Sequence, residues 1–125
     1  MNTDDKGMVI AADQVPQQQV AAGKDATMQV LIGPDQAPNF FLRRFTFGPG
    51  GGIPKHTNQV EHEQYVLRGR AKVGIGNVVH NVKAGDVVFI PKGVPHWYET
   101  QGDEPFEVLC SVPNLPDKME LLQEG

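Results

Sequence analysis

The sequence predicts an all-β protein whose sheet closes, or nearly closes, into a barrel. Short apolar runs follow one another at intervals of about 8–12 residues, separated by glycine, proline, asparagine and aspartate. Glycine (14) and proline (10) are frequent among the 125 residues, which suits a chain of tight turns. No stretch before residue 116 keeps a helical period of apolar residues. A chain of this length is expected to form one domain with its own core.

The composition excludes several classes of protein. The net charge is −4 and no basic block extends beyond Arg43-Arg44, so we expect no nucleic-acid partner and no anionic membrane surface. No run approaches the ~20 apolar residues of a membrane helix, and the polar, acidic start has no signal core. The single cysteine, Cys110, excludes an intramolecular disulfide and fits a reducing compartment. We therefore expect a cytoplasmic protein.

The elements are predicted from turn residues and alternation. Residues 1–7 are expected to be a disordered lead, and residues 8–125 a single domain. Residues 8–12 are predicted to form a short strand, which Val15-Pro16 ends because proline supplies no ladder donor. Pro116 begins a predicted helical turn over 116–122. Further strands are predicted at 27–32, 39–47 (followed by a turn at 48–52), 61–68, 71–76, 78–83, 86–91, 95–100 and 105–112.

The strand over 39–47 has one face that is more aromatic than the other. Alternation places Phe41, Arg43, Phe45 and Phe47 together on that face, which is the better candidate for the barrel interior. Arg43 would then lie inside and require a partner or a ligand. The alternative is that Arg43 lies near the strand end and extends its guanidinium into solvent.

Three histidines are candidates for a shared metal site. His56 and Asn58 are two residues apart and point to one face of an extended segment. A continuous strand would separate His56 from His62 by about 20 Å, too far to share an ion whose bonds to nitrogen are about 2.0–2.1 Å long. A shared site therefore requires the chain to reverse between Asn58 and His62, with His96 added from a later hairpin. His80 is interpreted as a surface residue or a hydrogen-bonded core residue.

The neighbours of His62 and His96 follow from the same alternation. Glu61 and Glu63 flank His62 and should point to the opposite face, so neither is a first choice of ligand. If His96 points inward, so does Tyr98, while Trp97 faces the other side.

Two stretches of this chain resemble the two motifs of the cupin family. The first motif is G-x(5)-H-x-H-x(3)-E-x(6)-G and the second is G-x(5)-P-x-G-x(2)-H-x(3)-N. Every gap length matches, with three departures: asparagine at the second histidine, histidine at the glutamate, and threonine at the closing asparagine. The matching positions are Gly50, His56, Asn58, His62 and Gly69, then Gly85, Pro91, Gly93, His96 and Thr100.

The resemblance implies a single-domain cupin of the small conserved-barrel type. The expected fold is a jelly roll, or double-stranded β-helix, with short N- and C-terminal extensions and a motif-bearing core over about 38–113. Histidine at the glutamate position resembles a bacterial subgroup that holds a divalent metal, often manganese, with four histidines. By position, the implied ligands are His56, His62 and His96, with Asn58 in the place of the fourth histidine. Asn58 either ligates weakly through its oxygen or marks the loss of the site.

The resemblance also implies the remaining components of a site. One face of the last strand would line the barrel, so the expected pocket wall includes Phe45, Val108 and Cys110. Arg43 and Tyr98 are the candidate catalytic residues, since they would supply polar groups near the ion. The ion would be manganese, iron, nickel, copper or zinc, because all accept nitrogen and oxygen ligands.

Three functions are compatible with these predictions. The first is a metal-dependent enzyme, of oxygenase-like or Lewis-acid type such as an isomerase, acting on a small, partly apolar carboxylate or carbonyl compound; the resemblance favours the oxygenase slightly. The second is a non-catalytic small-molecule-binding or sensor module, metal-free because of Asn58. The third is an assembly unit, since the resemblance implies a homodimer formed through an N-terminal strand within residues 8–32.

Overall fold

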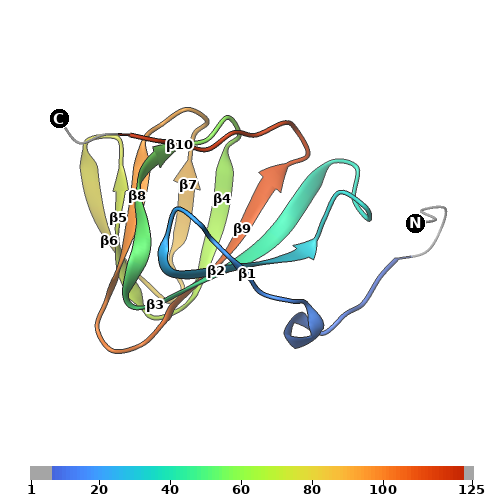
Figure 1. Cartoon of the computed structure of the whole chain (residues 1–125), viewed down its shortest axis with the longest axis horizontal. Helices are drawn as coiled ribbons and strands as arrows, with labels where there is room; N and C mark the ends of the chain where they lie inside the picture. Colours follow the sequence, from blue (N-terminus) through green and yellow to red (C-terminus); the bar gives the residue numbers. More distant parts are fainter. Residues whose placement is uncertain (1–6, 123–125) are drawn as a thin grey trace.

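The protein is a curled antiparallel sheet, as predicted (Figure 1). A computed structural model describes residues 7–122. Apart from Gly7, the lead predicted for residues 1–7 lies outside them. Besides one 3-10 turn, η1 (Ala12–Gln14), the described elements are the strands β1 (Gln18–Gln19), β2 (Lys24–Ile32), β3 (Phe40–Thr57), β4 (His62–Arg68), β5 (Arg70–Ile75), β6 (Val78–Lys83), β7 (Val87–Ile90), β8 (His96–Gln101), β9 (Phe106–Pro113) and β10 (Glu120–Leu121).

Strand β3 organises the sheet. The main path runs β6-β5-β8-β3-β9-β4-β7, and every pairing in it is antiparallel. The first half of the 18-residue strand β3 lies between β2 and β9, and its second half pairs with β8 and β10. One long strand therefore contributes to both ends of the barrel.

The interior is filled by alternate residues, as the period of two requires. Strand β9 alternates between buried and partly exposed positions, with Phe106, Val108, Cys110 and Val112 buried. The ring of Phe47 stacks on those of Tyr98 and Phe106, at centroid distances of 5.5 and 6.1 Å. Buried aromatic stacks of this kind contribute much of the stability of a small barrel.

Two predictions for the first half of the chain are wrong. Residues 8–11 form no strand and lead into η1; Val9 is fully exposed, and no described strand pairs with this segment. The turn predicted at 48–52 instead continues β3. Glycine is needed there because β3 passes close to β8: a Cβ on Gly52 would lie 2.0 Å from the backbone oxygen of Tyr98.

The helical turn predicted over 116–122 is also wrong. We call residues 114–122 the C-terminal strap. It runs extended across the end of the barrel (Figure 1), and its strand β10 pairs antiparallel with Thr57 and His56 of β3. The Leu122 N–H adds a hydrogen bond to the Lys55 oxygen at 3.0 Å. Backbone groups of the strap thus form hydrogen bonds with β3, whereas an isolated helical turn would leave many of its N–H and C=O groups without partners.

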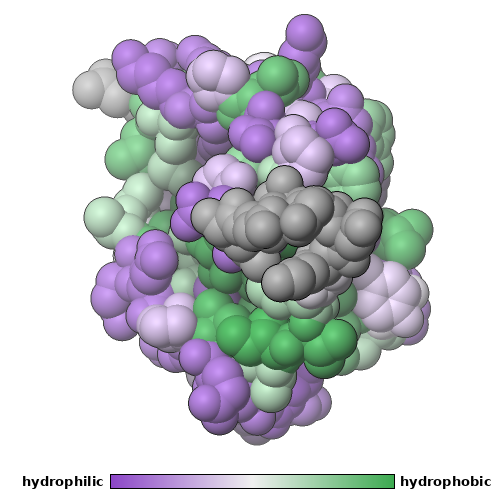
Figure 2. All heavy atoms as spheres, turned by 90° about the vertical axis from the view of Figure 1, so that its right-hand side faces the viewer, coloured by the Kyte–Doolittle hydropathy of each residue, from purple (hydrophilic) through white to green (hydrophobic). Residues whose placement is uncertain are grey.

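Apolar side chains are exposed on the part of the surface that carries the first described residues. Figure 2 shows apolar groups at this end of the molecule, and the exposed large apolar residues of its segments include Val9, Ile10, Ile32 and Phe40. Within residues 7–122, no helix is long and apolar enough to cross a membrane.

Candidate functional site

Three histidines from three strands meet inside one end of the barrel. His56 lies near the end of β3, while His62 begins β4 and His96 begins β8. His56 and His96 are register partners, and their ring centroids are 4.1 Å apart. The rings of His62 and His96 are 5.4 Å apart, and all three residues are at most 4% exposed. The chain reverses between Asn58 and His62, as predicted for a shared site.

The backbone fixes the tautomers of two of these histidines. Nδ1 of His56 lies 2.9 Å from the Pro54 oxygen, and Nδ1 of His96 lies 3.0 Å from the Val94 oxygen. A carbonyl oxygen only accepts, so each Nδ1 carries the proton and each Nε2 keeps a free lone pair. Metal-binding histidines are commonly oriented in this way.

His62 faces Asn58 rather than a backbone oxygen. Nε2 of His62 donates a hydrogen bond to Oδ1 of Asn58 over 3.1 Å, so this nitrogen carries the ring proton and would have to give it up to bind a metal. Nδ1 of His62 is buried and has no hydrogen-bond partner among the described residues. The amide nitrogen of Asn58 donates to Oδ2 of Asp117 at 3.0 Å. The Asn58 oxygen is therefore directed toward the histidines.

Burial keeps the three imidazoles neutral. Desolvation, together with the nearby Arg43 charge, lowers the pKa of His62 to about 3. Desolvation also lowers the pKa of His96 to about 4 and lowers that of His56. Neutral imidazole is the form that binds metal. At neutral pH, none of the three rings therefore takes up a second proton.

The types of side chain at this site suit a divalent ion, although they are not already arranged around one. Within residues 7–122, no group of three or more His, Cys, Asp or Glu side chains is arranged to hold a metal ion. The separation between Asn58 Oδ1 and His62 Nε2 is 3.1 Å, and two ligands at right angles on one ion, each at about 2.1 Å, lie about 3.0 Å apart. Nδ1 of His62 is buried without a hydrogen-bond partner among the described residues, so this ring could still bind a further group. These residue types suit manganese, iron, nickel, copper or zinc.

A small, partly open cavity of about 40 Å³ lies against these residues. It has room for one or two water molecules, whereas pockets for organic ligands measure roughly 300–1,000 Å³. Met119 of the C-terminal strap also lines it. The predicted wall residues Phe45, Val108 and Cys110 all border this cavity.

Arg43 points into the barrel rather than to solvent. Its Nη2 lies 3.6 Å from the Cys110 sulfur, its Nη1 lies 4.0 Å from the Met28 sulfur, and its Cζ is 5.1 Å from the centre of the Phe45 ring. Sulfur is a weak acceptor. Among the described residues, Nε of Arg43 has no partner at all. The guanidinium therefore retains donors for an anionic or carbonyl group.

Tyr98 is the second polar group of the wall. Its hydroxyl accepts a hydrogen bond from Nε2 of Gln64 at 2.7 Å. Burial raises the pKa of Tyr98, so the hydroxyl stays protonated and can donate. Sequence reasoning missed Gln64, although its place two residues after His62 on one strand put it on the same face. It also missed Asp117 and Met119, which lie beyond the family motifs.

The other polar predictions near the site are confirmed. Glu61, Glu63 and His80 are exposed, so none of them faces the cavity. Trp97 packs on the outer side of β8, where its indole nitrogen would lie 2.0 Å from a Cβ on Gly74.

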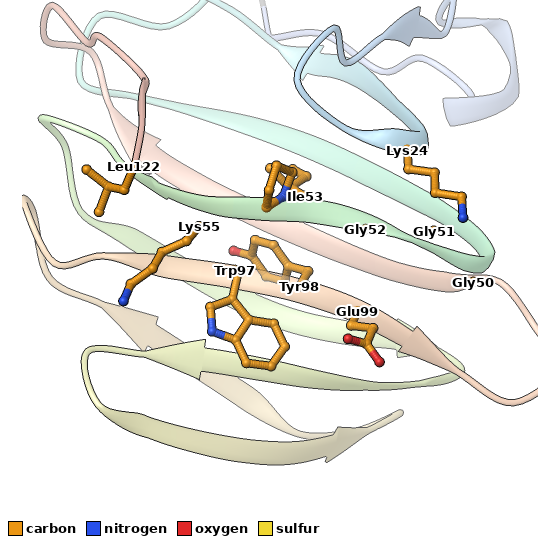
Figure 3. A pocket seen from close by; sticks show the side chains of 11 residues that line it. Lys24, Gly50, Gly51, Gly52, Ile53, Lys55, Trp97, Tyr98, Glu99 and Leu122 are labelled. Carbon is orange, nitrogen blue, oxygen red and sulfur yellow. The ribbon is translucent and has the colours of Figure 1, made fainter. Parts of the chain in front are cut away.

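A larger hollow of about 600 Å³ lies on the outer surface along β3 and β8. Figure 3 shows Lys24 and Glu99 at one end of it and Lys55 and Leu122 at the other. None of the three clustered histidines lines this hollow. The small cavity beside them is therefore the better candidate site, because reactive groups converge there.

The comparisons with known proteins agree with this architecture. The sequence profile described as the cupin domain matches residues 43–112. The chain belongs to the cupin family. Among solved cupin barrels, the polyketide cyclase RemF from Streptomyces resistomycificus is 29% identical, with a TM-score of 0.83 over 95% of this chain and 89% of that one.

Two curated relatives match shorter stretches. The uncharacterized protein MJ1618 of Methanocaldococcus jannaschii is 38% identical over 50 residues, 40% of each chain. The germin-like protein subfamily 2 member 1 of Arabidopsis thaliana is 34% identical over 76 residues, which cover 56% of this cupin and 35% of the relative. The matches to these two relatives thus cover well under half of their length.

Proposed function

We propose that this cupin binds one divalent metal ion through His56, His62 and His96, with the Asn58 oxygen as a fourth ligand. The observation that carries the proposal is the fixed tautomer of His56 and His96. In each, a backbone carbonyl at 2.9–3.0 Å holds the proton on Nδ1 and leaves Nε2 free. The rings of His56 and His96 lie 4.1 Å apart between centroids, which supports a shared ion.

The ligand set also suggests the chemistry. Three imidazoles and a carboxamide are neutral, so a bound ion would keep its full positive charge and act as a Lewis acid toward a carbonyl or carboxylate oxygen. The similarity to a polyketide cyclase supports carbonyl chemistry over oxygen activation, because ring closure of a carbonyl chain consumes no oxygen. We therefore favour a Lewis-acid enzyme over the oxygenase.

Two side chains would act on the substrate directly. Arg43 supplies a cation whose present neighbours are weak sulfur acceptors, so a substrate carboxylate or carbonyl would be a stronger partner. Tyr98 accepts from Gln64, so its own proton remains free to donate to a substrate oxygen. Together they would orient a small, partly apolar molecule against the histidines.

The size of the cavity sets a condition on this proposal. About 40 Å³ accommodates an ion with water but no organic substrate. Met119 borders the cavity from the C-terminal strap, which β10 joins to β3 by two residue pairs and which Asp117 joins to Asn58 and Gln59. Substrate entry would therefore require the strap to move.

We also propose that the protein forms a homodimer through residues 8–32. Val9 and Ile10 are exposed apolar residues in this segment, and a second copy would remove them from water.

The metal-binding proposal is tested by calorimetric titration of chelator-treated protein with Mn²⁺ and Ni²⁺. His56→Ala and His96→Ala should each lose at least about tenfold in affinity for both ions, since each removes one ligand. The exposed His80→Ala variant is the matched control and should bind as the native chain does. Native affinity in both ligand variants would refute the proposal.

A further inference from the structure

One carboxylate of the C-terminal strap holds the loop that follows β3. Asp117 accepts three hydrogen bonds: from the amide nitrogen of Asn58 at 3.0 Å, from the Gln59 N–H at 2.6 Å, and from the Lys118 N–H at 2.8 Å. One side chain thus joins the strap to the segment between His56 and His62. Both oxygens of the carboxylate are used.

These contacts decide which way the Asn58 carboxamide points. A carboxylate accepts hydrogen bonds and cannot donate them. The group that faces Asp117 must therefore be the amide nitrogen, and the oxygen must face the other way. On that side, Oδ1 of Asn58 lies 3.1 Å from Nε2 of His62.

We propose that Asp117 is a positioning residue of the metal site, which acts by holding the Asn58 oxygen toward the ion. The inference rests on the proposed function, since it assigns the source of affinity of that same site. An asparagine free to rotate would present its nitrogen as often as its oxygen, and the nitrogen is no ligand. Asp117 therefore compensates for the absence of a histidine at position 58.

The positioning role sets the size of the expected effect, because without Asp117 the Asn58 carboxamide loses the partner that directs its oxygen toward His62. Loss of a partner that orients a ligand typically weakens metal binding about 10–100-fold.

The test compares Asp117→Asn with Glu120→Gln. Both remove a carboxylate from the same strap, but Glu120 is exposed and, among the described residues, forms an ion pair with Lys118 alone, at 3.7 Å. In titrations with Mn²⁺ alone, Asp117→Asn should bind about 10–100-fold more weakly, while Glu120→Gln stays within about twofold. Native affinity in Asp117→Asn would overturn the inference and leave the metal site itself intact.

A double-mutant cycle separates positioning from a general effect on the strap. In an Asn58→Ala background, Asp117→Asn should change Mn²⁺ affinity by less than about threefold, because its effect passes through Asn58. An undiminished loss in that background would show that Asp117 acts by another route and would overturn the inference.

A metal-free readout keeps the two proposals distinguishable. In ¹H–¹⁵N spectra of the chelated native protein, the Asn58 side-chain amide protons should exchange slowly with water, and in Asp117→Asn they should exchange fast. Equal exchange would overturn the positioning role. If the native protein binds no Mn²⁺, the proposed metal site fails, even where the amide exchange shows that Asp117 holds Asn58.

Discussion

The side-chain amide of Gln64 donates a hydrogen bond to the hydroxyl of Tyr98 over 2.7 Å, from β4 to β8 across the barrel interior. Both residues are buried, and Gln64 also lies 3.6 Å from the Cys110 sulfur. This polar pair connects two sides of a largely apolar interior. Loss of this hydrogen bond should therefore affect both the stability of the protein and the candidate site.

Tyr98→Phe should destabilise the protein by about 1–3 kcal/mol, because it leaves the buried Gln64 amide without its oxygen acceptor. Urea denaturation measures the loss. Tyr65→Phe is the matched control, since Tyr65 is half exposed and should change stability by less than about 0.5 kcal/mol. Equal effects of the two substitutions would mean that the interior hydrogen bond contributes little.

Acid should weaken the metal-free protein as the pH falls below the ordinary pKa of histidine. His62 and His96 have pKa values of about 3 and 4 when folded, against an ordinary value of 6.5. Below pH 6.5 the unfolded chain therefore binds protons that the folded chain does not, so stability falls as pH falls. Each histidine contributes up to about 1.4 kcal/mol per pH unit.

Denaturation curves between pH 7 and pH 4.5 measure this dependence. His80→Ala should keep the native slope, since this histidine is exposed, while His96→Ala should flatten it. A native protein whose stability is constant over this range would show that the buried histidines are not held neutral.

Met119→Ala should speed the removal of bound Mn²⁺ by excess chelator several-fold, because it takes a side chain off the cavity while leaving every proposed ligand in place. Stopped-flow mixing measures the release rate. Leu115→Ala changes an exposed residue of the same strap and should release metal at the native rate. An unchanged rate in Met119→Ala would place the entry path elsewhere.

Ile10→Asp should convert the proposed dimer to a monomer in light scattering, since it places a charge in the apolar N-terminal segment. Val79→Asp, on the exposed face of β6, should leave the dimer mass unchanged. The pairing proposal fails if both variants keep the native mass.

The regular part of the fold could be predicted from sequence because alternation and turn residues act locally. The span of β6, 78–83, agrees with its prediction, and the inward face of Arg43 and Phe45 follows from the period of two. The wrong predictions concern segments whose structure depends on contacts with residues distant in the sequence. A glycine run continues β3 because Gly52 must pass close to Tyr98, which no local pattern reveals.

The candidate site was predictable to a similar extent. The spacing of His56, His62 and His96 allowed one shared site, and the structure brings their rings together. The role of Asp117 was not predictable, since it depends on the path of the C-terminal strap over the end of the barrel. The strap is extended because β3 offers it backbone partners, a tertiary effect that overrides the local preference for a helical turn.

The most direct test of the metal centre is the elemental content of untagged protein purified without chelators, beside the Asn58→His variant. If three histidines and an oriented carboxamide suffice, the native chain carries close to one equivalent of a divalent metal and the substitution changes this little. Metal found only in Asn58→His would contradict the account, because it would mean that the native residues do not retain an ion.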